Sequence, residues 1–248
     1  MPSSAAPEQY PSLRVTRDGA VSLLTLERPD RRNALDLTLC RSLTSSAVAE
    51  VGAGARVLVL TGEGSAFCAG ADLDGVYGTE FLEALYGLLH GLGRLPIPVI
   101  AAVNGPAIGA GTQLAIASDL RIADESARFG VPTARNAMAV DPWTIRRLAE
   151  LGGGGLARRL MIAAETIDRA TAVQHGLVDR IGTVDDALAW AAEIAGLAPL
   201  TLTHNKSVLN GATDEETDAS FAACWNSEDV VEAATARKER RAPVFRGR

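Results

Sequence analysis

Residues 98–111 read PVIAAVNGPAIGAG, a continuous apolar run that ends in a glycine-rich turn. Such short apolar runs are typical of strands that are buried on both faces. The turn leads into the uncharged segment 112–118, which we expect to form a buried helix. Residues 57–60 and 120–123 are apolar runs of the same kind, so the centre of the chain predicts buried strands that alternate with helices.

Further elements are expected on both sides of this centre. Residues 13–16 and 21–26 predict a hairpin around Asp18 and Gly19. The remaining expected elements are helices, at 36–51, 80–92, 141–151, 156–164, 168–175, 185–195, 200–211 and 215–241, with glycines at 152–155 and a break near Ser227. The pattern predicts an α/β protein with a disordered tail at 1–11, a core at 12–195 and a C-terminal helical region at 196–248.

Composition excludes several classes of protein. The 248 residues are 47% apolar and 22% charged, which is typical of a globular domain. A net charge of -6 and only 4% aromatic residues argue against a nucleic-acid-binding protein. Segment 95–118 lacks charges, but prolines and polar residues interrupt it, so we expect no membrane span.

The three cysteines, Cys40, Cys68 and Cys224, are odd in number and widely spaced. They predict neither a disulfide framework nor a metal site, and the histidines also lack metal-ligand spacing. The first residues have neither a basic start nor an apolar stretch, so they do not resemble a signal peptide. We therefore expect a reduced, cytoplasmic setting.

Two glycine-rich loops follow predicted buried strands, GEGSAFCAGADL at 62–73 and NGPAIGAG at 104–111. Loops at strand ends are where α/β proteins bind ligands. The second loop precedes a helix, so one amide from each loop is placed to hold a carbonyl oxygen that gains negative charge. The same residues also fit two tight turns that pack a strand against a helix. Neither loop has the spacing of a dinucleotide-binding or phosphate-binding loop.

The sequence resembles the enoyl-CoA hydratase/isomerase family, also called the crotonase superfamily. SAFCAGADL at 65–73 and the segment 98–111 carry this resemblance. RPDRRNAL at 28–35, FGVP at 129–132 and ATAVQHGLVDRI at 170–181 are similar to further family segments, in family order. The resemblance implies a crotonase-like spiral of ββα units with a C-terminal helical trimerisation region, assembled as a homotrimer or hexamer.

The same resemblance implies the ligand and the residues that bind it. The ligand is a fatty acyl-CoA, with no other cofactor and no metal, and the setting is fatty acid and lipid metabolism. The implied oxyanion-hole amides belong to Ala71 and Ala110. The implied CoA-binding and acyl-binding residues are Arg28, Arg31, Arg32, Ala34, Ala69, Asp72, Leu73 and Gly109, although the arginines also fit a solvated loop. Phe245 and the basic residues before it are expected near the CoA of their own or a neighbouring subunit.

The chain departs from the family at two positions. Hydratases of the family use two glutamates as general base and general acid, and Gln113 and Thr133 stand at those positions. Neither side chain titrates usefully near neutral pH, and the loss of one such group typically costs about 10²–10⁴-fold in rate. Both still form hydrogen bonds with a thioester or with water. We therefore expect an acyl-CoA-binding protein without efficient hydratase activity that acts as a carrier, a sensor or a delivery subunit, with other lipid-synthesis proteins as partners.

Two alternatives retain catalysis. Asp141 lies at a position similar to the catalytic aspartate of dienoyl-CoA isomerases and aryl-CoA dehalogenases, so it is a candidate acid or base for chemistry through a thioester enolate. Asp141-Pro142 is also a good helix start, and the carboxylate fits a helix cap. A hydratase of low activity is the other alternative.

Other candidate residues have simpler interpretations. His90 has no partner nearby in sequence, so we interpret it as a surface or core residue. Cys68 is expected to serve packing. Met138, Val140 and Trp143 fit either the wall of an acyl pocket or ordinary core.

Overall fold

The computed structural model describes residues 12–72 and 78–248, and the expected tail at 1–11 lies outside them. Its centre is a six-stranded sheet in the order β1-β2-β3-β4-β6-β9. Only β1 runs antiparallel to its neighbour. The strands are β1 (Leu13–Asp18), β2 (Val21–Leu26), β3 (Val57–Gly62), β4 (Val99–Val103), β6 (Leu120–Ala123) and β9 (Arg180–Ile181).

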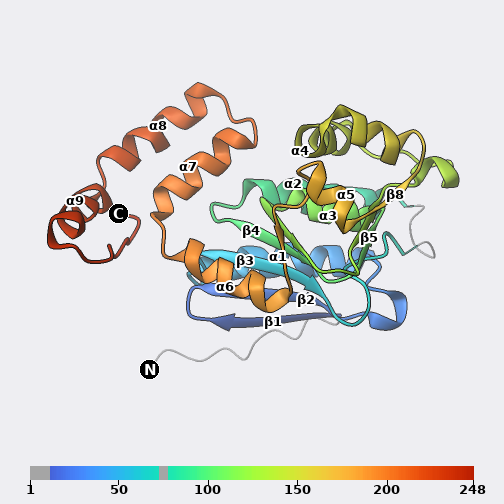
Figure 1. Cartoon of the computed structure of the whole chain (residues 1–248), viewed down its shortest axis with the longest axis horizontal. Coiled ribbons are helices and arrows are strands. Elements are labelled where there is room, and N and C mark those ends of the chain that lie inside the picture. Colours follow the sequence, from blue (N-terminus) through green and yellow to red (C-terminus); the bar gives the residue numbers. More distant parts are fainter. Residues whose placement is uncertain (1–11, 73–77) are drawn as a thin grey trace.

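The side chains of β3 alternate between the two faces of the sheet, and both faces are buried, which explains the continuous apolar run at residues 57–60. Leu58 and Leu60 point into one hydrophobic cluster, and Val57 and Val59 point into a second cluster across the sheet. Helices α1 (Leu37–Gly52), α2 (Thr79–Arg94) and α3 (Ala110–Ala117) contribute to the first cluster, and α6 (Val184–Ala195) to the second. The sheet is therefore buried on both faces, as parallel sheets are (Figure 1).

A second, three-stranded sheet has the order β5-β7-β8. Its strands are β5 (Pro106–Ile108), β7 (Arg128–Gly130) and β8 (Thr166–Asp168). Helices α4 (Pro142–Met161) and α5 (Arg169–Gln174) complete this part of the molecule. The small sheet holds the segment that leads into α3 beside the loop that follows β3.

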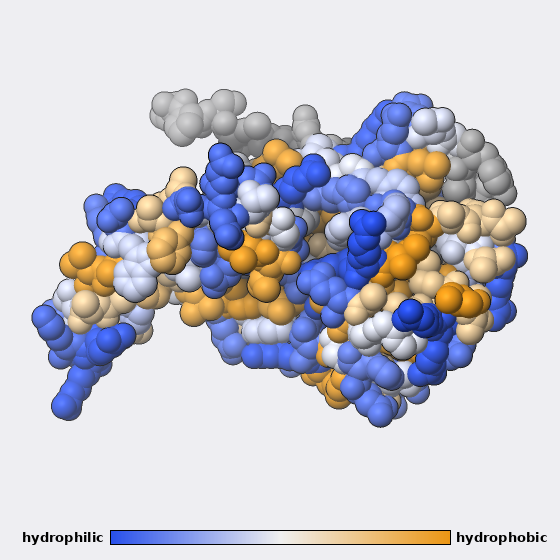
Figure 2. Space-filling view, turned by 90° about the horizontal axis from the view of Figure 1, so that it is seen from above, coloured by the Kyte–Doolittle hydropathy of each residue, from blue (hydrophilic) through white to orange (hydrophobic). Residues whose placement is uncertain are grey.

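Three C-terminal helices form an arm that extends away from the sheets (Figure 1). They are α7 (Pro199–Leu209), α8 (Asp214–Trp225) and α9 (Glu228–Glu239). The buried ammonium of Lys206 attaches the arm to the core, because it pairs with Asp119 at 2.8 Å and donates to the carbonyls of Leu92 and Ile97. Hydrophobic patches lie on the surface of the arm (Figure 2). The exposed hydrophobic residues of the arm include Val208, Leu209, Phe221, Trp225 and Val231.

The structure confirms the expected α/β class, the hairpin, the three buried strands and most helices. The expected separation of two helices at residues 152–155 is confirmed, because the helical span α4 (Pro142–Met161) is interrupted at Gly153, whose φ 82° and ψ 152° are not helical. Residues 106–108, within the glycine-rich loop expected at 104–111, form strand β5. No helix in the described ranges is long and apolar enough to cross a membrane.

Candidate functional site

A cavity of about 160 Å³ lies where the loops after β3 and β4 meet. Residues 69–71 and 108–110 form one side of it, helix α2 forms a second side, and the segment 132–140 closes it. Its lining is mostly apolar and includes Phe81, Leu82, Leu85, Met138 and Val140. Met138 and Val140 therefore belong to the wall of a pocket, whereas Trp143 packs against His90 with ring centroids 5.1 Å apart.

Strand-like pairing holds the two glycine-rich loops side by side. Cys68 pairs with Ala107 in a parallel bridge, in which the Cys68 N–H donates to Pro106 and the Ile108 N–H donates to Cys68. A Cβ added to Gly111 would lie 1.9 Å from the Cys68 carbonyl oxygen, so the close approach of the loops requires glycine there. The packing interpretation of the loops is therefore right for Gly111.

Several backbone N–H groups on this side of the cavity have no hydrogen-bond acceptor among residues 12–72 and 78–248. They include those of Gly70 and Ala71 in the first loop and that of Ala110, the first residue of α3. Gly109 adopts φ 56° and ψ -117°, and this conformation turns the chain into the helix. Because the first N–H groups of a helix lack intrahelical partners and lie at its positive end, the Ala110 amide is suited to an electron-rich oxygen.

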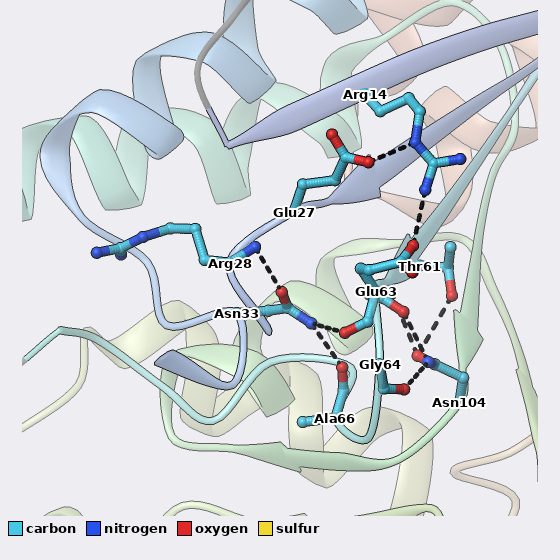
Figure 3. Close-up of polar contacts among 10 residues, drawn as sticks. Arg14, Glu27, Arg28, Asn33, Thr61, Glu63, Gly64, Ala66 and Asn104 are labelled. Carbon is cyan, nitrogen blue, oxygen red and sulfur yellow. Dashed lines mark hydrogen bonds and ion pairs between the residues drawn. The ribbon is translucent and has the colours of Figure 1, made fainter. Parts of the chain in front are cut away.

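Asn33 holds the turn that begins the first loop (Figure 3). Its side chain is fully buried, and its Nδ2 donates to the carbonyls of Glu63 at 2.9 Å and Ala66 at 2.7 Å. Its Oδ1 accepts from the backbone N–H of Arg28 at 2.9 Å. Asn33 has φ 58°, a left-handed conformation that asparagine tolerates better than most residues.

Asn104, at the end of β4, holds the same turn from the other side (Figure 3). Its Nδ2 donates to the carbonyls of Gly62 at 2.7 Å and Gly64 at 3.2 Å. Its Oδ1 accepts from the Gly62 N–H and the Thr61 hydroxyl. Both asparagines lie within the sequence motifs, but the motifs alone indicate no role for either side chain. The signal available for Asn33 was an asparagine in a charged loop, where left-handed residues are common.

Arg28, in the early loop, forms ion pairs within the fold and is not simply solvated. The Arg28 guanidinium pairs with Asp36 at 3.1 Å and Asp72 at 2.8 Å, so it joins this loop to the first motif. Arg31 and Arg32 are exposed at the short helix Pro29–Arg31. Ala34 is buried beside them, Ala69 and Gly109 line the cavity, and Leu73 lies outside the described residues.

Gln113 and Thr133 both line the cavity. Gln113 lies on α3 with only 3% of its surface exposed, and its Oε1 accepts no hydrogen bond within the described structure. Thr133 begins the short helix Thr133–Asn136. No aspartate, glutamate, histidine, lysine or arginine from the described ranges lines this cavity.

The carboxylate of Asp141 is fully engaged next to the cavity wall. Its Oδ1 accepts from the N–H of Thr144 at 3.0 Å and from the Thr144 hydroxyl at 2.6 Å, which confirms the helix cap. The Oδ2 of Asp141 lies 2.9 Å from Nε2 of His90. The backbone N–H of Asp141 donates to the hydroxyl of Tyr86, and burial raises the pKa of that hydroxyl. His90 thus has a partner 51 residues away, which its local sequence did not indicate.

The positions of Cys68 and Phe245 in the structure bear on two further expectations. Cys68 is buried, and burial raises its pKa to about 12, which agrees with a packing role. The carbonyl of Phe245 accepts from Arg56 at 3.0 Å, next to the start of β3 and not at the end where the cavity lies. The backbone of Phe245 is therefore held at the other end of β3 from the cavity, and its approach to the CoA of its own or a neighbouring subunit stays a prediction.

Known proteins resemble this chain over nearly its whole length. The family model for enoyl-CoA hydratase/isomerase matches residues 16–248. "Probable enoyl-CoA hydratase echA6" of Mycobacterium tuberculosis (strain CDC 1551 / Oshkosh) is 47% identical over 240 residues, which cover 94% of this chain and 98% of that protein. The 2,3-dehydroadipyl-CoA hydratase of Escherichia coli (strain K12) is 33% identical over 252 residues, covering 95% and 99% respectively. The solved enoyl-CoA hydratase of Bacillus anthracis superposes with a TM-score of 0.88 at 30% identity, covering 96% of this chain and 100% of that one.

Proposed function

The chain belongs to the enoyl-CoA hydratase/isomerase family, and from this premise we propose that it binds fatty acyl-CoA thioesters without hydrating them efficiently. One observation carries the proposal. The backbone N–H groups of Ala71 and Ala110 at the cavity have no described acceptors, and the described lining of the cavity contains no carboxylate.

The backbone N–H groups of Ala71 and Ala110 are the part of the cavity that would bind the thioester. A thioester oxygen between Ala71 and Ala110 accepts two hydrogen bonds from groups that are already oriented, so little reorganisation is needed. The two asparagines fix the first loop, and the bridge between Cys68 and Ala107 fixes its distance from the second. The apolar side chains of α2 then surround the acyl chain.

We expect hydration to be inefficient because the cavity lining lacks a general base and a general acid. Adding water across the double bond needs a base for the attacking water and an acid for the neighbouring carbon. Gln113 and Thr133 supply neither, and both oxygens of Asp141 already have partners. The absence of each group costs about 10²–10⁴-fold in rate, so two absences reduce turnover severely.

Calorimetry and a hydration assay on one preparation test this proposal. We expect a saturated acyl-CoA to bind with a Kd of about 1 μM or tighter. We expect crotonyl-CoA to bind but to keep its enoyl absorbance. The double variant Gln113→Glu with Thr133→Glu should gain hydration, whereas each single variant should gain much less. Stereospecific hydration by the unchanged protein, or no binding of any CoA ester, would overturn the proposal.

The pair formed by His90 and Asp141 favours one alternative, an isomerase that acts through an enolate. Asp141 directly follows Val140 in the cavity wall. The variant Asp141→Asn removes the charge and keeps the cap, because asparagine caps helices as well as aspartate does. If enoyl-CoA isomerisation is detected and falls steeply in this variant, the alternative is right. If acyl-CoA binds equally well and no isomerisation is found in either protein, it is wrong.

We further propose that the protein assembles as a homotrimer or a dimer of trimers through its C-terminal arm. The exposed side chains of Phe221, Trp225 and Val231 support this, because large apolar side chains exposed on a subunit favour contact between subunits. Light scattering coupled to size exclusion tests it. Trp225→Glu should shift the mass toward a monomer, and a monomeric unchanged protein would contradict the assembly.

A further inference from the structure

A groove of about 580 Å³ lies next to the acyl-CoA cavity. Thr133, Met138, Ala139 and Val140 line both spaces. The rest of the groove is lined by Ala134 and by α4, with residues from both sides of Gly153, so the break in this helix helps to shape the groove. The proposed function gives this groove no ligand.

The part of the groove that α4 contributes is largely apolar. Its apolar side chains there are Ile145, Ala149, Ala157, Met161 and Ile162. Ile145 is 43% exposed and Ile162 is 76% exposed, so apolar surface is open to solvent at the groove. A mostly apolar space of this size falls within the range of small-molecule binding sites.

Two of the four arginines of α4 also line the groove, Arg146 and Arg158. Arg146 forms no hydrogen bond or ion pair with its side chain among the described residues. The Arg158 guanidinium donates only to the carbonyl of Gly154, one turn earlier in the same helix. No aspartate or glutamate of the described ranges lines the groove, so neither cation has a carboxylate partner there.

The other two arginines of α4 do not line the groove, and both are paired. Arg147 lies 3.1 Å from Glu150, and Arg159 lies 2.9 Å from Glu165. The chain as a whole has a net charge of -6, so carboxylates outnumber cations, yet none lines the groove among the described residues. This contrast within one helix indicates that the groove is complementary to an anion with an apolar body.

We propose that the groove is a binding site for an unesterified fatty acid, separate from the acyl-CoA cavity. The carboxylate accepts hydrogen bonds from the guanidinium groups of Arg146 and Arg158, because a planar fork of donors matches the two oxygens of a carboxylate. The alkyl chain lies along Ile145, Met161 and Ile162 and removes their apolar surface from water. This inference goes beyond the proposed function, because neither the thioester nor its backbone donors are involved.

Other classes of small molecule fit the groove less well. Inorganic phosphate and sugar phosphates satisfy the arginines but leave the apolar side chains of α4 exposed to water. A neutral or cationic amphiphile covers those side chains but gives the two guanidinium groups no charged acceptor. A fatty acid satisfies both parts of the groove.

Calorimetric titration with decanoate tests this inference, on protein that is saturated with a saturated acyl-CoA so that the cavity is occupied. We expect decanoate to bind with a Kd of about 100 μM or tighter. Hexanoate should bind more weakly because it buries fewer methylene groups, and decylamine should bind at least about tenfold more weakly because its charge is repelled. Displacement of the acyl-CoA by decanoate would place the fatty acid in the cavity and would overturn the inference.

Variants of α4 assign the binding to the groove. Arg146→Gln and Arg158→Gln should each weaken decanoate binding by about tenfold, because each removes a charged donor. Arg159→Gln is the matched control, since it removes a charge outside the groove lining, and it should keep the affinity for decanoate within about twofold. All three variants should bind acyl-CoA as the unchanged protein does. Equal weakening in the three variants would contradict the site.

Two further results would decide against the inference. Absence of decanoate binding to the unchanged protein is the first. The second is a change of mass in light scattering for Ile162→Asp without any decanoate binding, which would make the groove a contact between subunits. If no CoA ester binds, the proposed function fails, but titration of the ligand-free protein and the arginine variants still tests the fatty acid site.

Discussion

The backbone and the side chains that line the cavity are held in different ways. The backbone of Ala71 and Ala110 is fixed by bridges between loops and by two asparagine side chains. Gln113 and Thr133 instead contribute side chains from two different elements, and the oxygen of Gln113 is buried without a described partner. In the function that we propose, binding of a thioester depends on the backbone groups, and the reaction depends on the side chains. Under that proposal, the comparison teaches that the ligand can be kept while the chemistry changes.

The largest effect is expected where the two loops touch. Gly111→Ala places a Cβ 1.9 Å from the Cys68 carbonyl, so the loops must separate. We expect the free energy of unfolding to fall by about 3 kcal/mol or more and acyl-CoA binding to be lost. Denaturant unfolding measures the first and calorimetry the second. Gly155→Ala is the matched control, because nothing lies within 4 Å of its added Cβ. Equal losses in both variants would show that the contact between the loops is not special.

Asn33→Ala should have the next largest effect. It leaves the part-buried carbonyl of Glu63 and the buried carbonyl of Ala66 without the Asn33 donor and puts alanine at φ 58°. We expect a loss of about 2–4 kcal/mol in the free energy of unfolding, measured by urea denaturation. Asn210→Ala removes a single exposed hydrogen bond to Gly93 and should cost less than about 0.5 kcal/mol. If the two variants lose the same stability, Asn33 does not hold the turn in the way described.

Ala110→Pro tests the donor itself. Proline is tolerated at the first position of a helix, but it has no N–H. We expect acyl-CoA affinity to fall by about tenfold to a hundredfold, with stability nearly unchanged. Ala110→Gly keeps the N–H and should bind within about threefold of the unchanged protein. Comparable binding by all three proteins would mean that this amide does not contact the thioester.

The smallest effect is expected at His90. Its bond to Asp141 is partly exposed, with 33% of the His90 side chain accessible to solvent. His90→Ala should lower the free energy of unfolding by about 1 kcal/mol or less and leave acyl-CoA affinity unchanged, because the Thr144 cap remains. Thermal unfolding and calorimetry measure the two quantities. A large loss of affinity would instead place the pair of His90 and Asp141 within the binding site.

Much of the fold was predictable because long elements leave a periodic pattern. The runs at 57–60 and 120–123 predicted buried strands, and β3 shows why, since its side chains alternate between two hydrophobic clusters. Strands β5, β7 and β8 escaped prediction because three residues are too short for a period to show. The glycine run at 152–155 predicted a break between two helices, and the non-helical backbone of Gly153 interrupts α4 there.

The site was predictable only in part. The resemblance gave the positions of Ala71, Ala110, Gln113 and Thr133, and the structure brings all four to one cavity. The contacts that hold this cavity join distant segments, such as Asn33 with residues 63–66. Local sequence patterns carry no information on such pairings, so the asparagines remained without a role until the fold was known.

Infrared difference spectroscopy of a bound acyl-CoA, ¹³C-labelled at its thioester carbonyl, tests the central claim most directly. Two N–H donors from Ala71 and Ala110 should polarise the carbonyl more strongly than water does, so its stretching frequency should fall below the value of the free ester in solution. In Ala110→Pro the frequency should return toward that value. A bound thioester whose frequency lies at or above the aqueous value in the unchanged protein would contradict the account.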